Sequence, residues 1–129
     1  MFPKGQKRKK RHKRTISCDI DAKTRKIVHE RDRHHCIFCE LGYFLPTEDE
    51  LIGYQMIEVM HFIPRSQGGK GIPENLALGC RLHHRMLDNG SEGLRKDMLK
   101  VFQNYLVARY PDWDKKNLVY DKWGWLKGD

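Results

Sequence analysis

The stretch that decides the fold reads Glu58-Val-Met-His61-Phe-Ile-Pro-Arg-Ser-Gln-Gly-Gly. Residues 54–63, which contain its first half, are rich in aromatic and β-branched side chains and predict a strand that ends before a proline. Residues 65–73 hold three glycines and a proline and predict a long loop. Residues 76–79 are a short apolar run and predict a second strand. A strand, a loop and a strand therefore form the centre of the predicted fold.

Helices are predicted on both sides of these strands, which makes the fold class α+β. A helix should start at Cys80 or Arg81 and end near residue 88, because the Asn-Gly pair that follows is a stop signal. Upstream, Asp21 can cap a helix over residues 22–33, whose apolar contacts are Ile27 and Val28.

The C-terminal part of the chain predicts a further helix and an extension. From residue 92 onward, apolar side chains recur at intervals of three and four, which predicts an amphipathic helix that ends before Pro111. Three tryptophans follow within residues 113–125, and this segment should pack on the domain as a short helix and a strap. We therefore expect a disordered basic tail (1–15), one domain (16–110) and a Trp-rich extension (111–129).

Two pairs of metal-ligating side chains, Cys36 with Cys39 and Cys80 with His83, each have two intervening residues. This spacing lets both members of a pair face one point, and zinc takes four such nitrogen and sulfur ligands in a tetrahedron. The sequence therefore predicts a closed structural Zn²⁺ site that joins distant parts of the chain and stabilises the fold.

Three alternatives to this ligand set stay open. The first cysteine pair could be free or redox-active, and His34 or His35 could contact the zinc. Cys18 lacks a paired neighbour, so it is interpreted as a small packed apolar residue, although it could replace His83 as the fourth ligand.

The net charge of +8 is concentrated at the N-terminus. Eight of the 25 basic residues precede the first acidic one, Asp19, and the remaining 17 balance the 17 acidic residues. Such a run repels its own compaction, which predicts disorder over residues 1–15. It is either a polybasic arm that contacts phosphates through residues such as Lys9, Lys10 and Arg11, or a solubilising tail.

The composition limits the compartment. The chain has no run of about 18 apolar residues, which argues against a membrane span. Its basic N-terminus lacks the apolar segment of a secretory signal. We therefore expect a cytoplasmic protein, whose four cysteines serve as metal ligands rather than in disulfides.

The deciding stretch, followed by Asn75, then His83-His84 and Asp88, resembles the HNH endonuclease family, and its phage-encoded branch in particular. The resemblance covers about residues 21–90. It depends on a His, an Asn and a His in that order, with a Pro-Arg-Ser-x-Gly-Gly turn between the first two. It implies a ββα-metal motif, in which two strands and a helix enclose one divalent ion.

The resemblance also implies roles for three catalytic residues. His61 corresponds to the general base that activates water. Asn75 corresponds to the middle residue, which fixes the loop and, through it, the backbone around His61. His84 corresponds to the closing histidine, which binds the divalent ion at the start of the helix.

The chemistry of these residue types suits phosphodiester hydrolysis. A neutral imidazole can take a proton from water, and a divalent ion can stabilise the leaving oxygen. His84 and Asp88 are four residues apart on the predicted helix and share a face, which suits Mg²⁺, Mn²⁺, Ni²⁺ or Zn²⁺. Asp88 could instead only cap the turn that follows it.

Three arginines are candidate nucleic-acid contacts. Arg65 follows the first strand and could clamp a phosphate, and Arg81 and Arg85 near the start of the helix could join it. Arg85 could equally be a plain surface charge.

One position departs from the family pattern. Many members carry Asp or His directly before the general base as a metal ligand, whereas this chain has Met60, whose thioether is a poor ligand for a hard ion. His84 and Asp88 would then bind the ion with help from substrate and water, and its affinity should be lower.

The function expected from the sequence is metal-dependent hydrolysis of DNA, with a non-catalytic zinc module that binds DNA or RNA as the alternative. The resemblance to phage proteins adds the large subunit of the packaging terminase as an expected partner, and a bacterial host's cytoplasm as the location. A monomer or weak dimer is expected.

Overall fold

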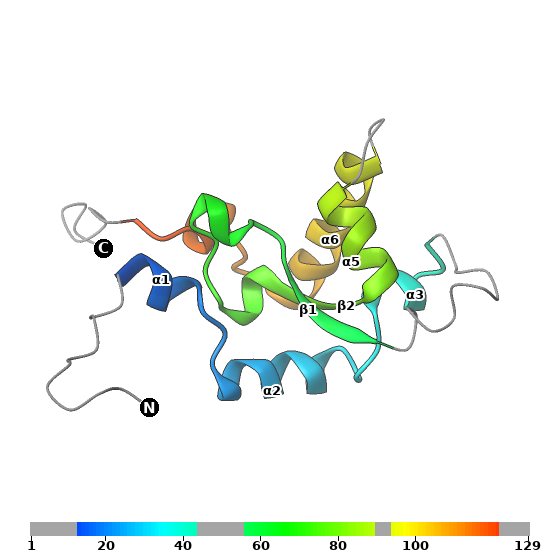
Figure 1. Ribbon diagram of the computed structural model, residues 1–129, viewed down its shortest axis with the longest axis horizontal. Coiled ribbons are helices and arrows are strands. Elements are labelled where there is room, and N and C mark those ends of the chain that lie inside the picture. The colour runs from blue at the N-terminus through cyan, green and yellow to red at the C-terminus, as the bar shows by residue number, and fades with distance from the viewer. Residues whose placement is uncertain (1–12, 44–55, 90–93, 122–129) are drawn as a thin grey trace, which may run out of the picture.

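The computed structural model describes residues 13–43, 56–89 and 94–121. Its centre is a two-stranded antiparallel sheet of β1 (Ile57–His61) and β2 (Leu76–Cys80), in which His61 pairs with Leu76 and Ile57 with Cys80. The helix α5 (Arg81–Asn89) follows β2 directly (Figure 1). The α+β class and the order strand, loop, strand, helix are confirmed.

The long loop between the strands contains two short 3₁₀ turns, η2 (Arg65–Gln67) and η3 (Pro73–Asn75). The first strand is shorter than predicted, because Phe62 and Ile63 leave the ladder and enter the core as buried side chains. Residues 54–55, also predicted as strand, lie outside the described residues.

One face of the sheet packs against α2 (Ala22–Arg31). The carboxylate of Asp21 caps this helix by accepting from the backbone N–H of Thr24 at 2.7 Å, as predicted. Val28 is wholly buried against Leu76 and Leu78, but Ile27 is 40% exposed, so its predicted apolar contact is wrong. Adjacent helical residues point about 100° apart, so only one of this pair can face the sheet.

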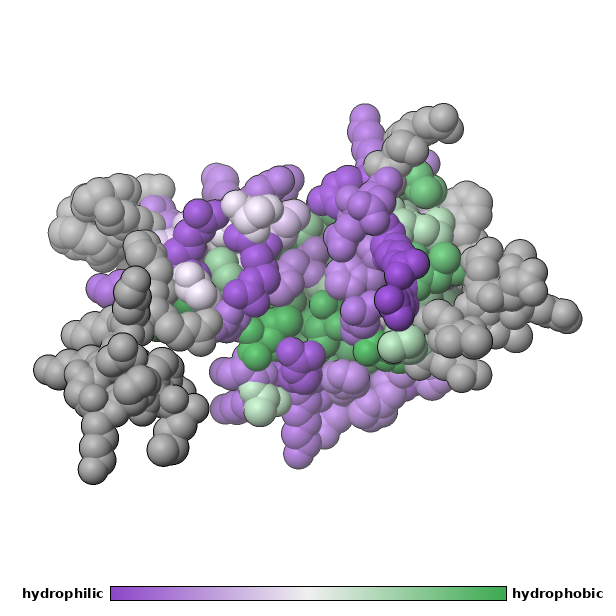
Figure 2. Space-filling model, in the orientation of Figure 1, coloured by the Kyte–Doolittle hydropathy of each residue, from purple (hydrophilic) through white to green (hydrophobic). Residues whose placement is uncertain are grey.

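The other face of the sheet packs against α3 (Ile37–Glu40), α5 and α6 (Leu94–Arg109). The predicted stripe of α6 is confirmed, since Met98, Phe102 and Leu106 are buried at a spacing of four residues. The view in Figure 2 shows mainly hydrophilic residues over the helices. Hydrophobic residues gather along the strip between α2 and the helices α5 and α6.

The two ends of the described chain meet the long loop. Residues 13–15, predicted to belong to a disordered tail, begin the helix α1 (Lys13–Cys18), and residues 1–12 lie outside the described residues. At the other end, η4 (Lys115–Leu118) and residue 119 bond to the loop through a bridge between Gly69 and Val119. Trp113 packs on the core as predicted, whereas Trp123 and Trp125 are not described. None of the described helices is both long and apolar enough to cross a membrane.

Candidate metal centre and candidate active site

Four predicted zinc ligands come together at the junction of α3, β2 and α5. Cys36 precedes α3 and Cys39 lies within it, while Cys80 ends β2 and His83 lies in the first turn of α5. Their ligand atoms all lie within 4.8 Å of one another, close enough to bind one metal ion such as zinc.

The donor geometry fits a tetrahedral ion. His83 Nδ1 lies 3.4, 3.3 and 3.2 Å from the sulfurs of Cys36, Cys39 and Cys80, and the sulfurs of Cys39 and Cys80 are 3.8 Å apart. Zinc–sulfur bonds of about 2.3 Å at tetrahedral angles place two sulfurs about 3.8 Å apart. The cluster therefore has the dimensions of a zinc site.

The protonation states also suit a metal ligand. His83 Nε2 lies 2.6 Å from the carbonyl oxygen of Tyr43, so it donates its proton there and Nδ1 keeps a lone pair toward the sulfurs. The hydrogen bond from Cys36, together with the contact with His83, lowers the pKa of Cys80, while the same hydrogen bond and burial raise the pKa of Cys36. Of this pair, Cys80 is therefore the thiol that ionises more readily, and zinc binds thiols in their ionised form.

The predicted general base, His61, ends β1 beside α1. Its Nε2 lies 3.2 Å from the carbonyl oxygen of Cys18, and donation to this acceptor leaves Nδ1 as the basic nitrogen. Burial is the main cause that lowers the pKa of His61 below its ordinary value of 6.5. The charges of Arg65 and His84 act in the same direction, and the bond to Cys18 opposes them. The imidazole is therefore neutral, and able to accept a proton, at pH 7.

Asn75 is wholly buried and holds together the two ends of the long loop. Its Oδ1 accepts from the N–H of Ile63 at 2.8 Å, and its Nδ2 donates to the carbonyl oxygens of Ile63 and Lys70. Its own carbonyl accepts from the N–H of Phe62 at 2.8 Å. These contacts fix the backbone that directly follows His61.

His84 lies between two carboxylates. Its Nδ1 is 3.7 Å from Glu58 Oε1, and its Nε2 is 3.4 Å from Asp88 Oδ2. The two carboxylates thus approach opposite nitrogens of one ring. Among the residues that the structure describes, only the Cys/His cluster has three or more such ligand atoms mutually close. This region therefore offers a pair of ligands and an acidic neighbour rather than a preformed cage.

No protein-family model matches the chain, and a search of the curated proteins found no match. The interpretation of this site therefore depends on its own residues and geometry.

The other predicted site residues have different positions. Arg65 bonds to Asp19 at 2.5 Å, and Arg81 and Arg85 are exposed on α5. Lys9, Lys10 and Arg11 lie outside the described residues. Cys18 is buried away from the Cys/His cluster, and His34 and His35 are not part of that cluster.

Sequence reasoning missed two contacts of the candidate site. Glu58 shares a strand face with Met60, two residues away, and this alternation was a signal that it could approach α5. The carbonyl of Cys18 could not have been found, because a backbone group carries no side-chain signature and no helix was predicted over residues 13–18.

Proposed function

We propose that this chain is a zinc-stabilised HNH endonuclease that hydrolyses phosphodiester bonds of DNA. The observation that carries the proposal is His61, a partly buried neutral imidazole whose Nε2 is held by a backbone carbonyl and whose backbone is fixed by Asn75. A base that is oriented by a second group and is unprotonated at neutral pH is suited to deprotonate water.

Each residue has a part in this reaction. His61 Nδ1 takes the proton of the attacking water, while Asn75 keeps the ring at the end of β1. His84 and Asp88 would hold the divalent ion through Nε2 and a carboxylate oxygen, which lie 3.4 Å apart. Such an ion, when bound, stabilises the negative charge on the leaving oxygen.

Glu58 gives this ligand pair a support that the sequence did not suggest. A carboxylate near Nδ1 of His84 favours the proton on that nitrogen and so leaves Nε2 as the ligand. The pattern carboxylate, histidine and metal also makes the imidazole a stronger ligand. In the proposed site, Glu58 partly compensates for the metal ligand that is missing at Met60.

Replacing His61 is expected to abolish cleavage without unfolding the chain. His61→Ala removes the base and should slow DNA cleavage by about 10²–10⁴-fold. The measurement is conversion of supercoiled plasmid to nicked and linear forms with Mg²⁺, Mn²⁺ or Ni²⁺. His29→Ala, on α2, is the matched control and should cleave like the wild type. If the wild type leaves plasmid intact with every metal, the nuclease proposal is wrong.

The cleavage rate is expected to depend on pH through His61. Protonation blocks the base, so the rate should fall as pH drops through the pKa of His61, which lies below 6.5. The rate should therefore be on a plateau at pH 7. Single-turnover rates between pH 5 and 8 at saturating metal test this, and a midpoint above 6.5 would contradict it.

A non-catalytic zinc module that binds DNA or RNA is the second candidate. Met60 favours it, since this side chain is wholly buried in the core and cannot bind an ion. The module would retard nucleic acid in a gel yet leave it uncut with every metal.

A terminase large subunit as the protein partner stays a prediction, and co-purification of the two chains tests it.

A further inference from the structure

A hollow opens next to His61, between α1 and the η2 turn. It measures about 310 Å³, and it is lined by five described residues: Arg14, Thr15, Cys18, Arg65 and Ser66. These five include two arginines and two residues with hydroxyl groups, and none of the five is acidic. Guanidinium and hydroxyl groups are the side-chain donors that recognise phosphate oxygens.

Both guanidinium groups are already held in place. Arg14 Nη2 donates to the carbonyl oxygen of Ser66 at 2.8 Å, which joins α1 to the η2 turn. Arg65 Nη2 bonds to Asp19 Oδ1 at 2.5 Å. Each guanidinium has five N–H donors, and each of these contacts uses one nitrogen. Both arginines are therefore held at the edge of the hollow while retaining donors for a ligand.

The seating of α1 that creates this hollow depends on a close backbone contact. The N–H of Gly71 donates to the carbonyl oxygen of Ser17 at 3.0 Å. A Cβ at Gly71 would lie 2.1 Å from the carbonyl oxygen of Asp19, so no larger residue fits there without displacing the chain. Helix α1, which carries Arg14, is thus held against the long loop that follows His61.

The hollow and the candidate base share one residue. Cys18 lines the hollow, and its carbonyl oxygen accepts from His61 Nε2. A phosphate bound between the two arginines would therefore lie beside the imidazole rather than at a remote surface.

We propose that this hollow is a phosphate-binding subsite, in which Arg14 and Arg65 hold a backbone phosphate of the nucleic acid next to the scissile phosphate, which the water activated by His61 attacks. The inference rests on the proposed function, because it assumes a nucleic-acid substrate at His61. It adds α1 to the substrate-binding surface, as a second wall opposite the η2 turn.

Binding of a fluorescent DNA duplex by the full zinc-loaded chain tests the subsite. A His61→Ala background prevents cutting, and anisotropy is measured over a salt series. Adding Arg14→Ala should remove one phosphate contact, weaken binding by about tenfold and reduce the slope of log K against log salt by about 0.9. Arg109→Ala on α6 removes the same charge far from the hollow and is the matched control, with an expected change below about twofold.

A second pair of variants leaves Arg14 bonded to Ser66. Thr15 lines the hollow, whereas its neighbour Ile16 is exposed and does not. Thr15→Glu should weaken binding several-fold more than Ile16→Glu, because both add one negative charge to α1 but only one adds it inside the hollow. Protection of the Gly71 amide from hydrogen exchange checks that α1 stays seated.

The subsite proposal is wrong if Arg14→Ala weakens DNA binding no more than Arg109→Ala, and Thr15→Glu no more than Ile16→Glu, while the Gly71 amide stays protected. If the wild type cuts DNA in that case, the proposed nuclease stands and only the subsite fails. If instead the pairs differ as expected but the wild type never cuts, the subsite stands and the catalytic proposal fails.

Discussion

Removal of the metal from the Cys/His cluster is expected to unfold most of the chain. The ion would join α3 to the end of β2 and the start of α5, segments about 40 residues apart in the sequence. Without it, three buried or half-buried thiols and His83 still lie against one another in the core, but no metal bonds hold their three segments together. Structural zinc contributes roughly 10–16 kcal/mol in zinc-finger peptides, which equals or exceeds the usual net stability of a domain, about 5–15 kcal/mol.

Variants of single cysteines make this expectation specific. Cys36→Ser should lower the zinc content well below one per chain, together with the helical circular-dichroism signal and the melting temperature. Cys18→Ser changes another buried cysteine outside the cluster and should keep one zinc per chain after dialysis. Full zinc content in Cys36→Ser, or an apo chain that melts like the holo chain, would contradict the assignment.

The parts of the fold that could be predicted are those with a local signature. The glycines of the long loop, the cap at Asp21 and the four-residue stripe of α6 each reflect a local backbone or packing requirement. The two ligand pairs could also be predicted, since zinc binding requires particular residue types at a particular spacing.

The parts that could not be predicted are those made by tertiary contacts. The basic run suggested disorder, yet residues 13–15 begin α1, whose C-terminal end bonds to the long loop through the N–H of Gly71 and the carbonyl oxygen of Ser17. Likewise, Asp32 falls near the end of the predicted helix over residues 22–33, and nothing near it in sequence shows that it is buried.

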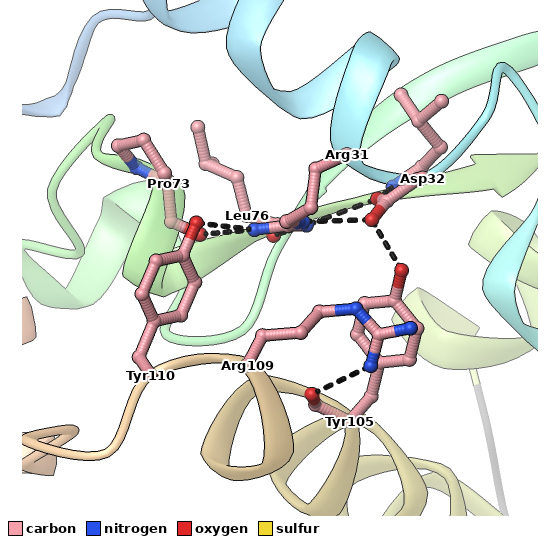
Figure 3. A network of polar contacts seen from close by, with 8 residues as sticks. Arg31, Asp32, Pro73, Leu76, Tyr105, Arg109 and Tyr110 are labelled. Carbon is pink, nitrogen blue, oxygen red and sulfur yellow. Dashed lines mark hydrogen bonds and ion pairs between the residues drawn. The ribbon is translucent and has the colours of Figure 1, made fainter.

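Asp32 is the centre of a buried polar network that ties α2 to the sheet and to α6 (Figure 3). Its carboxylate accepts from Arg31 Nε at 2.7 Å, from the N–H of Leu78 at 2.9 Å and from the hydroxyl of Tyr105. Arg31 in turn donates to the carbonyl oxygens of Pro73 and Leu76, which flank Asn75. Burial, together with the bond to Asp32, raises the pKa of Tyr105 to about 12, so its hydroxyl stays a donor.

Asp32→Ala is expected to lower the free energy of unfolding by about 3–5 kcal/mol. The side chain of Arg31 is only 12% exposed, and the substitution removes the carboxylate that balances its charge. It also leaves the N–H of Leu78 without its acceptor. Tyr105→Phe is the matched control: it removes one donor and keeps the ion pair, so it should cost only about 1–2 kcal/mol. Urea unfolding of the zinc-loaded variants measures both.

Because Arg31 also holds the carbonyls of Pro73 and Leu76 near Asn75, Asp32→Ala should loosen the loop after His61. Faster hydrogen exchange at the Ile63 amide would show this. A loss below about 1 kcal/mol would mean that the network adds little to stability.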